Sequence, residues 1–102
     1  MITDQYYNRR LMECDATTKV YDEVDEFLKQ KADAARQEAE ALAAKPEGEK
    51  TQEDSNKETA LLLESVACYT LMNKLQANRI KMLKDTNRIA KQYGFQLRNG
   101  KS

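Results

Sequence analysis

The sequence predicts an all-α fold, an antiparallel helical hairpin of two long helices with coiled-coil-like packing. One proline-glycine break, Lys45-Pro46-Glu47-Gly48, separates two long stretches with helical periodicity. The chain of 102 residues holds three Gly and one Pro, and 33% of its residues are charged. That composition is typical of long helices and coiled coils. At this length we expect one domain, residues 1–102.

The first helix is expected over residues 3–45. Thr3 is a suitable N-cap, and Ile2 and Tyr7 occupy the positions of a hydrophobic staple. Pro46 should end the helix because it lacks an amide proton. Alternating three- and four-residue spacing, as at heptad a and d positions, defines one stripe on this helix: Tyr7, Leu11, Cys14, Thr18, Tyr21, Asp25, Leu28, Ala32, Ala35, Ala39 and Leu42. A shorter row beside it is Val20, Val24 and Phe27.

Residues 46–54 are polar and are expected to form a solvated linker. Ser55 and Glu58 have the spacing of a capping box, which predicts that the second helix spans residues 55–93.

Gly94 suits the left-handed position that follows a helix, and Phe95 can fold back on Ile89 or Ala90. Residues 94–102 are therefore expected to form a mobile tail.

The second helix is apolar on two faces. We expect the first stripe to form the intramolecular seam; it is Leu62, Val66, Tyr69, Ile80 and Leu83. We expect the second stripe to form a partner interface; it is Leu61, Met72, Leu75, Met82, Ile89 and Tyr93. One helix covers one stripe, and an uncovered stripe would cost a short chain much of its marginal stability. The pattern predicts protein partners, either a homo-oligomer or a helical partner protein.

Polar residues interrupt the first stripe at Asn73, Gln76 and Asn87. Buried Asn at such positions can fix register and oligomeric state. The alternative is that these residues mark the solvated edge of the stripe, and the sequence does not decide between the two interpretations.

The net charge is zero, but it is divided along the chain. Residues 1–58 carry 15 acids and 9 bases, and residues 59–102 carry 2 acids and 8 bases. This favours pairing of an acidic helix with a basic one; a basic nucleic-acid-binding segment over 74–101 is the alternative. We expect the acidic run Asp22–Glu26 to pair with the bases of the second helix, Lys74, Arg79, Lys81, Lys84, Arg88 and Lys91. Nucleic acid is not the expected partner, because no aromatic residues that stack on bases interleave with these bases.

The residues of common active sites are missing. The chain has no His, which removes the usual general base and metal ligand. An antiparallel hairpin places Cys14 opposite residue 87, so Cys14 and Cys68 are expected to lie roughly 30 Å apart, beyond disulfide reach. We expect reduced thiols, with an inter-chain bridge left open. The sequence predicts no enzyme: no catalytic residue, no metal site and no cofactor.

Charged residues near Met1 argue against a signal peptide. No apolar run approaches the roughly 20 residues of a membrane span. We therefore expect a chain that is cytoplasmic as synthesised.

Two segments resemble a known family. The segment from Tyr69-Thr70-Leu71 through Gln76, Asn78 and Ile80-Lys81-Met82-Leu83-Lys84-Asp85 is similar to the C-terminal helix of type III secretion needle subunits. Leu42-Ala43-Ala44-Lys45-Pro46 resembles the end of their first helix. The chain departs from the family in a longer segment between Pro46 and Tyr69, and in Gly94-Phe95-Gln96-Leu97 after Tyr93.

The resemblance implies a helical hairpin without enzymatic activity that polymerises into a hollow filament for unfolded effectors. Helical chaperones keep such subunits apart in the cytoplasm, and the assembled needle is secreted to the cell surface. Lys81, Lys84 and Asp85 would be among the polar contacts of the second helix. The sequence therefore predicts an assembly protein of a type III protein-secretion apparatus. The alternative is a small cytoplasmic chaperone or regulator that forms a coiled-coil dimer or heterodimer with a secretion partner.

Overall fold

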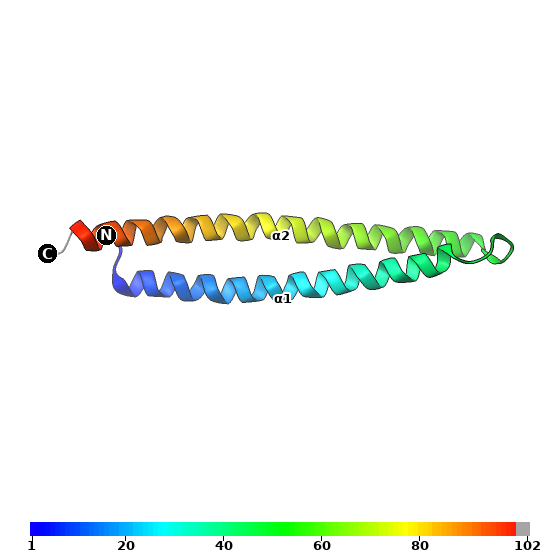
Figure 1. Ribbon diagram of the computed structural model, residues 1–102, viewed down its shortest axis with the longest axis horizontal. Helices are drawn as coiled ribbons and strands as arrows, with labels where there is room; N and C mark the ends of the chain where they lie inside the picture. The colour runs from blue at the N-terminus through cyan, green and yellow to red at the C-terminus, as the bar shows by residue number, and fades with distance from the viewer. Residues whose placement is uncertain (100–102) are drawn as a thin grey trace. The chain divides into compact units, whose positions relative to one another are not determined.

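The fold is all-α in the computed structural model, which describes residues 1–99. Helix α1 spans Asp4–Ala43, helix α2 spans Gln52–Asn99, and a 3-10 turn, η1, lies between them at Glu47–Glu49. The two helices run side by side and are joined through η1 (Figure 1). No strand occurs within residues 1–99, so the predicted helical hairpin is confirmed.

Thr3 caps α1 as the sequence predicted. The Tyr6 backbone N–H donates to Thr3 Oγ1 at 3.1 Å, and the Tyr7 N–H donates to the Thr3 carbonyl at 2.9 Å. The helix ends at Ala43, two residues before the expected Lys45. This earlier end follows from the strong bias of the residue before a proline away from helical geometry.

The predicted start of α2 is wrong. The helix begins at Gln52, and its capping box is formed by Thr51 and Asp54 rather than by Ser55 and Glu58. The Asp54 N–H donates to Thr51 Oγ1 at 3.1 Å, and the Thr51 N–H donates to Asp54 Oδ2 at 3.1 Å. Asp stands in place of the more common Glu at the third helical position, so this box does not match the usual sequence pattern.

Two lysines of the linker form ion pairs with acidic residues at the start of α2. Lys45 Nζ lies 3.1 Å from Asp54 Oδ2, and Lys50 Nζ lies 3.2 Å from Glu58 Oε1. Both ion pairs tie the turn to the first two turns of α2. Glu58 therefore serves the linker and not a cap at Ser55.

The predicted tail is also wrong over residues 94–99, because α2 continues through Gly94 to Asn99. Gly94 has no positive φ and sits in an ordinary helical turn. A glycine lowers helix stability by about 1 kcal/mol relative to Ala, but it does not by itself end a helix. Gln96 anchors this last segment: its Nε2 donates to the Ile2 carbonyl at 2.6 Å, and its Oε1 accepts from the Ile2 N–H at 2.8 Å. The remainder of the predicted tail, residues 100–102, lies outside the described residues.

The stripe predicted for the first helix, from Tyr7 to Leu42 and hereafter the α1 stripe, is confirmed as the face of α1 that is covered. All of its residues are buried or half-buried, whereas Val20, Val24 and Phe27 are exposed. The helix runs without a break through Asp25, although this charged residue interrupts the apolar pattern. Among the described residues, Asp25 Oδ1 is buried without a hydrogen-bond partner.

Packing divides the chain into two compact units. The loop unit is Glu23–Lys74, and the terminal unit is Met1–Asp22 together with the chain from Leu75 onward. The loop unit has a seam of mostly small side chains, and its buried residues are Leu28, Ala32, Ala35, Ala39, Ser65 and Cys68.

The terminal unit is held by larger side chains and by contacts between its two ends. The Tyr7 and Tyr93 rings stack with centroids 4.2 Å apart and planes inclined by 10°. The Tyr93 hydroxyl donates to Asp4 Oδ1. Ile89, about one helical turn before Tyr93 in α2, is buried.

Candidate functional site

The residues predicted to form the intramolecular seam lie on the surface. Their relative exposures are 46% for Leu62, 59% for Val66, 39% for Tyr69, 44% for Ile80 and 38% for Leu83. The seam prediction for this stripe is therefore wrong.

The residues predicted to meet a partner protein instead face the hairpin interior. Ile89 is buried, and Leu61, Met72, Leu75, Met82 and Tyr93 are half-buried. They share a three-four spacing with the buried Ser65, Cys68 and Thr86. The two stripes of α2 thus have the opposite roles to those expected, and the predicted partner interface is the seam.

The small residues of the loop unit give a physical reason for this reversal. The α1 stripe presents Ala32, Ala35 and Ala39, all less than 6% exposed. Alanines on one helix allow close approach, and the small Ser65 and Cys68 of α2 suit such a narrow seam. A stripe carrying Val66 and Tyr69 at the same positions would hold the helices further apart and leave the alanines partly uncovered.

The stripe that remains uncovered in the loop unit is Leu62, Val66 and Tyr69, hereafter the open stripe. It borders a shallow groove lined by Ala39, Glu40, Ala43, Glu58 and Leu62. The Tyr69 hydroxyl lies 3.5 Å from Asp33 Oδ1, so the stripe has an acidic edge. Exposed apolar groups rimmed by polar ones are characteristic of protein-interaction surfaces.

The other flank of the loop unit is polar and internally paired. Lys31 Nζ lies 3.0 Å from Glu64 Oε1, and Lys57 Nζ lies 3.4 Å from Glu38 Oε1. Hydrogen bonding to Glu64 raises the pKa of the Lys31 ammonium above its usual value. Since these charges pair with each other across the two helices, this flank is a weaker candidate for an interface.

Asn73, Gln76 and Asn87 are all exposed, which decides between the two interpretations of these residues. They lie on the solvated side of α2 and do not fix a register in the seam.

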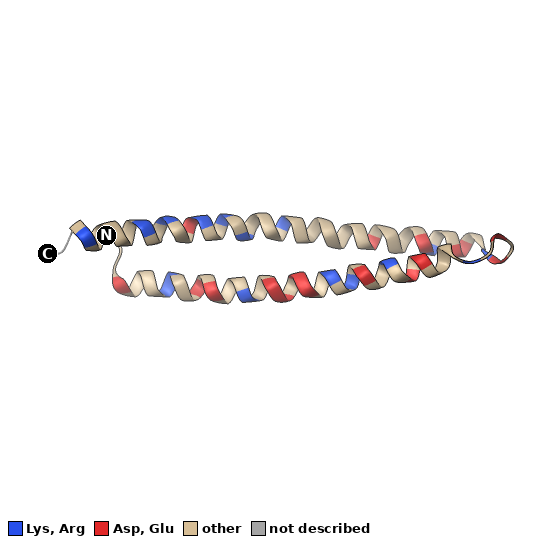
Figure 2. Cartoon of the chain, viewed as in Figure 1, with Lys and Arg blue, Asp and Glu red and all other residues tan. Residues whose placement is uncertain are grey.

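Charge is distributed unequally between the units. The loop unit carries 12 acidic and 7 basic residues, and the terminal unit carries 5 acidic and 10 basic residues. Figure 2 shows the basic residues gathered along the C-terminal half of α2.

The expected pairing of these bases with the acidic run of α1 is confirmed for one residue. Arg79 Nη1 lies 2.7 Å from Asp22 Oδ1. Arg88 pairs within α2, with Asp85 at 3.5 Å. Among residues 1–99 no ion pair is recorded for Lys81, Lys84 or Lys91, so most of the basic charge on this surface is available to another molecule.

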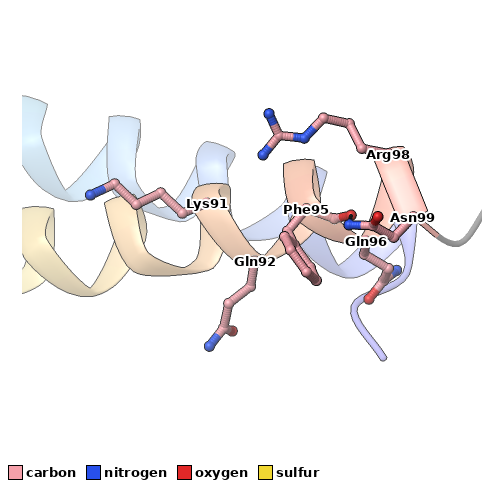
Figure 3. A pocket seen from close by; sticks show the side chains of 6 residues that line it. All are labelled: Lys91, Gln92, Phe95, Gln96, Arg98 and Asn99. Atoms are coloured by element: carbon pink, nitrogen blue, oxygen red, sulfur yellow. Dashed lines mark hydrogen bonds between the residues drawn. The ribbon is translucent and has the colours of Figure 1, made fainter.

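Phe95 was expected in a tail, but the structure places it on the surface of a helix. The residue lies in α2 and is 63% exposed. Lys91 and Arg98 extend from the helix on either side of it, and the shallow depression is also lined by Gln92, Gln96 and Asn99 (Figure 3). The signal that could have found it is the spacing of four and three residues that separates Phe95 from Lys91 and Arg98.

Both cysteines are free thiols, with Cys68 buried and Cys14 half-buried. Cys14 lines a small cavity with Met82 and Thr86. Thr86 is one residue from position 87, which the predicted register places opposite Cys14.

Residues 1–99 contain no group of three or more Cys, Asp or Glu side chains arranged to hold a metal ion. Neither helix, over the part that the structure describes, has a stretch long and apolar enough to cross a membrane.

Comparison of the chain with protein-family models, with curated proteins and with solved structures finds no match.

Proposed function

We propose that the chain is a non-enzymatic assembly protein whose open stripe is covered by another protein chain. The observation that carries this proposal is the exposure of Leu62, Val66 and Tyr69 on a helix whose other apolar stripe is already used in the seam. Covering each large apolar side chain stabilises a complex by about 1.5–3 kcal/mol when burial is complete. A protein partner is the occupant that fits a flat apolar stripe on a long helix.

The assembly is proposed to belong to a type III protein-secretion apparatus, with the chain as a self-assembling subunit. Support comes from the resemblance of residues 69–93 and 42–46 to needle subunits. The exposure of Lys81 and Lys84 is compatible with the polar contacts that the resemblance implies. Asp85 differs, because it is half-buried and pairs with Arg88.

Size-exclusion chromatography with light scattering, over a hundredfold range of protein concentration, tests this function. We expect a mass that rises with concentration, as for a self-assembling subunit. A constant dimer, or a complex of fixed stoichiometry with another protein, would instead favour the chaperone or regulator. A stable, helical monomer at every concentration would contradict an assembly function.

A matched pair of variants locates the surface. Val66→Asp places a charge in the open stripe and should clearly weaken association while far-UV circular dichroism stays unchanged. Ala67→Asp changes the neighbouring residue, which is also exposed but lies outside the stripe, and should associate like the wild type. Equal association of both variants would remove the open stripe from the interface.

A further inference from the structure

Two exposed surfaces of the chain carry the same seven-residue repeat with opposite charge. On α2, within the terminal unit, the repeat is an apolar residue followed by a base: Leu83-Lys84, Ala90-Lys91 and Leu97-Arg98. On α1, within the loop unit, the repeat is an acid followed by an apolar residue: Glu26-Phe27, Asp33-Ala34 and Glu40-Ala41. We name these sets the basic ladder and the acidic ladder.

Both ladders are accessible. Lys84, Lys91 and Arg98 are exposed, as are Glu26 and Glu40, and Asp33 is half-buried. Phe27 is 62% exposed and Leu97 is 55% exposed, so each ladder also presents an uncovered large apolar side chain.

The charges of the ladders are largely unpaired within the chain. Over residues 1–99 no ion pair is recorded for the three bases of the basic ladder. Asp33 pairs with the exposed Arg36 of the same helix at 3.2 Å. Glu26 accepts a hydrogen bond from Gln30 at 3.0 Å, which leaves its charge uncompensated.

The repeats match in length. Seven residues of a helix rise about 10.5 Å, so successive rungs of the two ladders have the same spacing. Three rungs on each helix can therefore meet in register over roughly 21 Å between the first and last charges.

The order of the two columns also sets the orientation. Each ladder has two columns, formed by the first and by the second residue of its pairs. Where two parallel helices face each other, the first column of one helix meets the second column of the other, as g meets e in a parallel coiled coil. The basic ladder runs apolar then basic, and the acidic ladder runs acidic then apolar. Parallel docking consequently joins apolar to apolar and base to acid, whereas antiparallel docking would set apolar columns against charged ones.

We propose that the basic ladder of one copy of this chain docks in parallel on the acidic ladder of a second copy. This inference rests on the proposed assembly function and names a contact for it. The two docking surfaces are different, so each dimer keeps one free ladder of each kind and association continues beyond two copies unless a ring closes. The charges select partner and orientation, and Phe27 and Leu97 contribute apolar contact.

A charge-swap experiment tests the contact. Lys84→Glu/Arg98→Glu reverses two rungs of the basic ladder, and Glu26→Lys/Glu40→Lys reverses the facing rungs of the acidic ladder. Each variant alone should show at least a tenfold weaker association by light scattering in low salt, with unchanged helicity. An equimolar mixture should recover the wild-type mass. In the mixture the unchanged ladder of one variant meets the unchanged ladder of the other, and the two reversed ladders also carry opposite charges.

The control for net charge is Lys19→Glu/Lys29→Glu, which changes two exposed lysines outside both ladders. This variant should associate as the wild type does. If the control loses association equally, or if the mixture of swapped variants fails to recover it, the ladder contact is wrong while the assembly function stands. A wild type that remains monomeric would contradict the assembly function itself.

Single-stranded nucleic acid is the other anionic occupant to be tested on the basic ladder, since Phe95 lies beside Lys91 and Arg98. Fluorescence anisotropy with a labelled oligonucleotide supplies that test. Two results together would overturn the proposal in favour of a nucleic-acid surface. The wild type would bind the oligonucleotide in a salt-sensitive way that Lys84→Glu/Arg98→Glu loses, and the mixture of variants would not recover the wild-type mass.

Discussion

The loop unit and the terminal unit join the same two helices in different ways. In the loop unit the seam is narrow, and Ala32 and Ala39 are buried to 1% exposure or less. In the terminal unit the tyrosines Tyr7 and Tyr93 stack and stay half-buried, and Gln96 ties the first residues of the chain to the end of α2. Complete burial therefore accompanies small side chains, while the larger side chains reach past the seam and stay partly in water.

This difference explains how a stable seam can leave large apolar side chains on the surface. A seam of alanines packs closely but removes little apolar area per residue from water. The large apolar side chains of the loop unit that the seam does not use, such as Phe27, Leu62 and Val66, stay on the surface. The residues that would be the core of a globular domain are thus available for contacts between chains.

The greatest loss of stability should follow truncation of Leu28, the one large buried side chain of the loop unit. Leu28→Ala should lower the free energy of unfolding by about 2–5 kcal/mol, because it removes buried apolar atoms and leaves a cavity. Phe27→Ala, at the neighbouring exposed residue, should change stability by less than about 0.5 kcal/mol. Urea denaturation followed by circular dichroism measures both, at a concentration below that of association. Similar losses in the two variants would mean that Leu28 does not lie in the seam.

A second substitution tests whether the alanine seam needs its small residues. Ala35→Leu should destabilise the hairpin by about 1–3 kcal/mol, since extra methylene groups force the helices apart. Ala34→Leu adds the same group at the adjacent exposed position and should be nearly neutral. Thermal unfolding compares the pair. A stabilising Ala35→Leu would show that the seam contains unfilled space.

A third test concerns the turn that closes the loop unit. Thr51→Ala removes a cap of α2 and should cost about 1 kcal/mol, whereas Ser55→Ala, at the cap expected from sequence, should cost less.

The Thr51 backbone N–H and Lys45 lower the pKa of Asp54. A lowered folded pKa gives stability that is present above the unfolded pKa and is lost as pH falls through the folded value. Acidification should therefore destabilise the wild type more than Asp54→Asn, as judged by thermal unfolding at several pH values.

A smaller change in stability is expected in the terminal unit at alkaline pH, where Tyr93 ionises. Its hydrogen bond to Asp4 raises the pKa of the Tyr93 phenol. A raised folded pKa gives stability that is present below the unfolded value, near 10, and is lost as pH rises through the folded value. Ultraviolet titration of the tyrosines should show one late-ionising phenol that is missing in Tyr93→Phe. If the wild type shows no phenol that ionises later than the four tyrosines of Tyr93→Phe, the contact does not persist in solution.

Much of the fold could be predicted from local sequence. The Pro46 break, the Thr3 cap and the α1 stripe depend on interactions within a few residues, and the structure confirms them. The α2 boundaries were less predictable, because Thr51 and Asp54 form an unusual capping box and Gln96 holds the helix end through a contact with Ile2, which is 94 positions away in sequence.

The candidate site shows the limit of periodicity more sharply. Heptad spacing revealed that α2 has two apolar stripes, but both fit a seam equally well by pattern alone.

Local sequence patterns predict the number of helices, the position of the turn, the covered face of α1 and the division of charge along the chain. Which stripe of α2 is buried follows only from the packing of the two helices against each other. The physical reason is that the choice depends on fit between side-chain volumes across two helices: the alanines of α1 suit the small Ser65 and Cys68, and that match leaves Leu62, Val66 and Tyr69 facing the solvent.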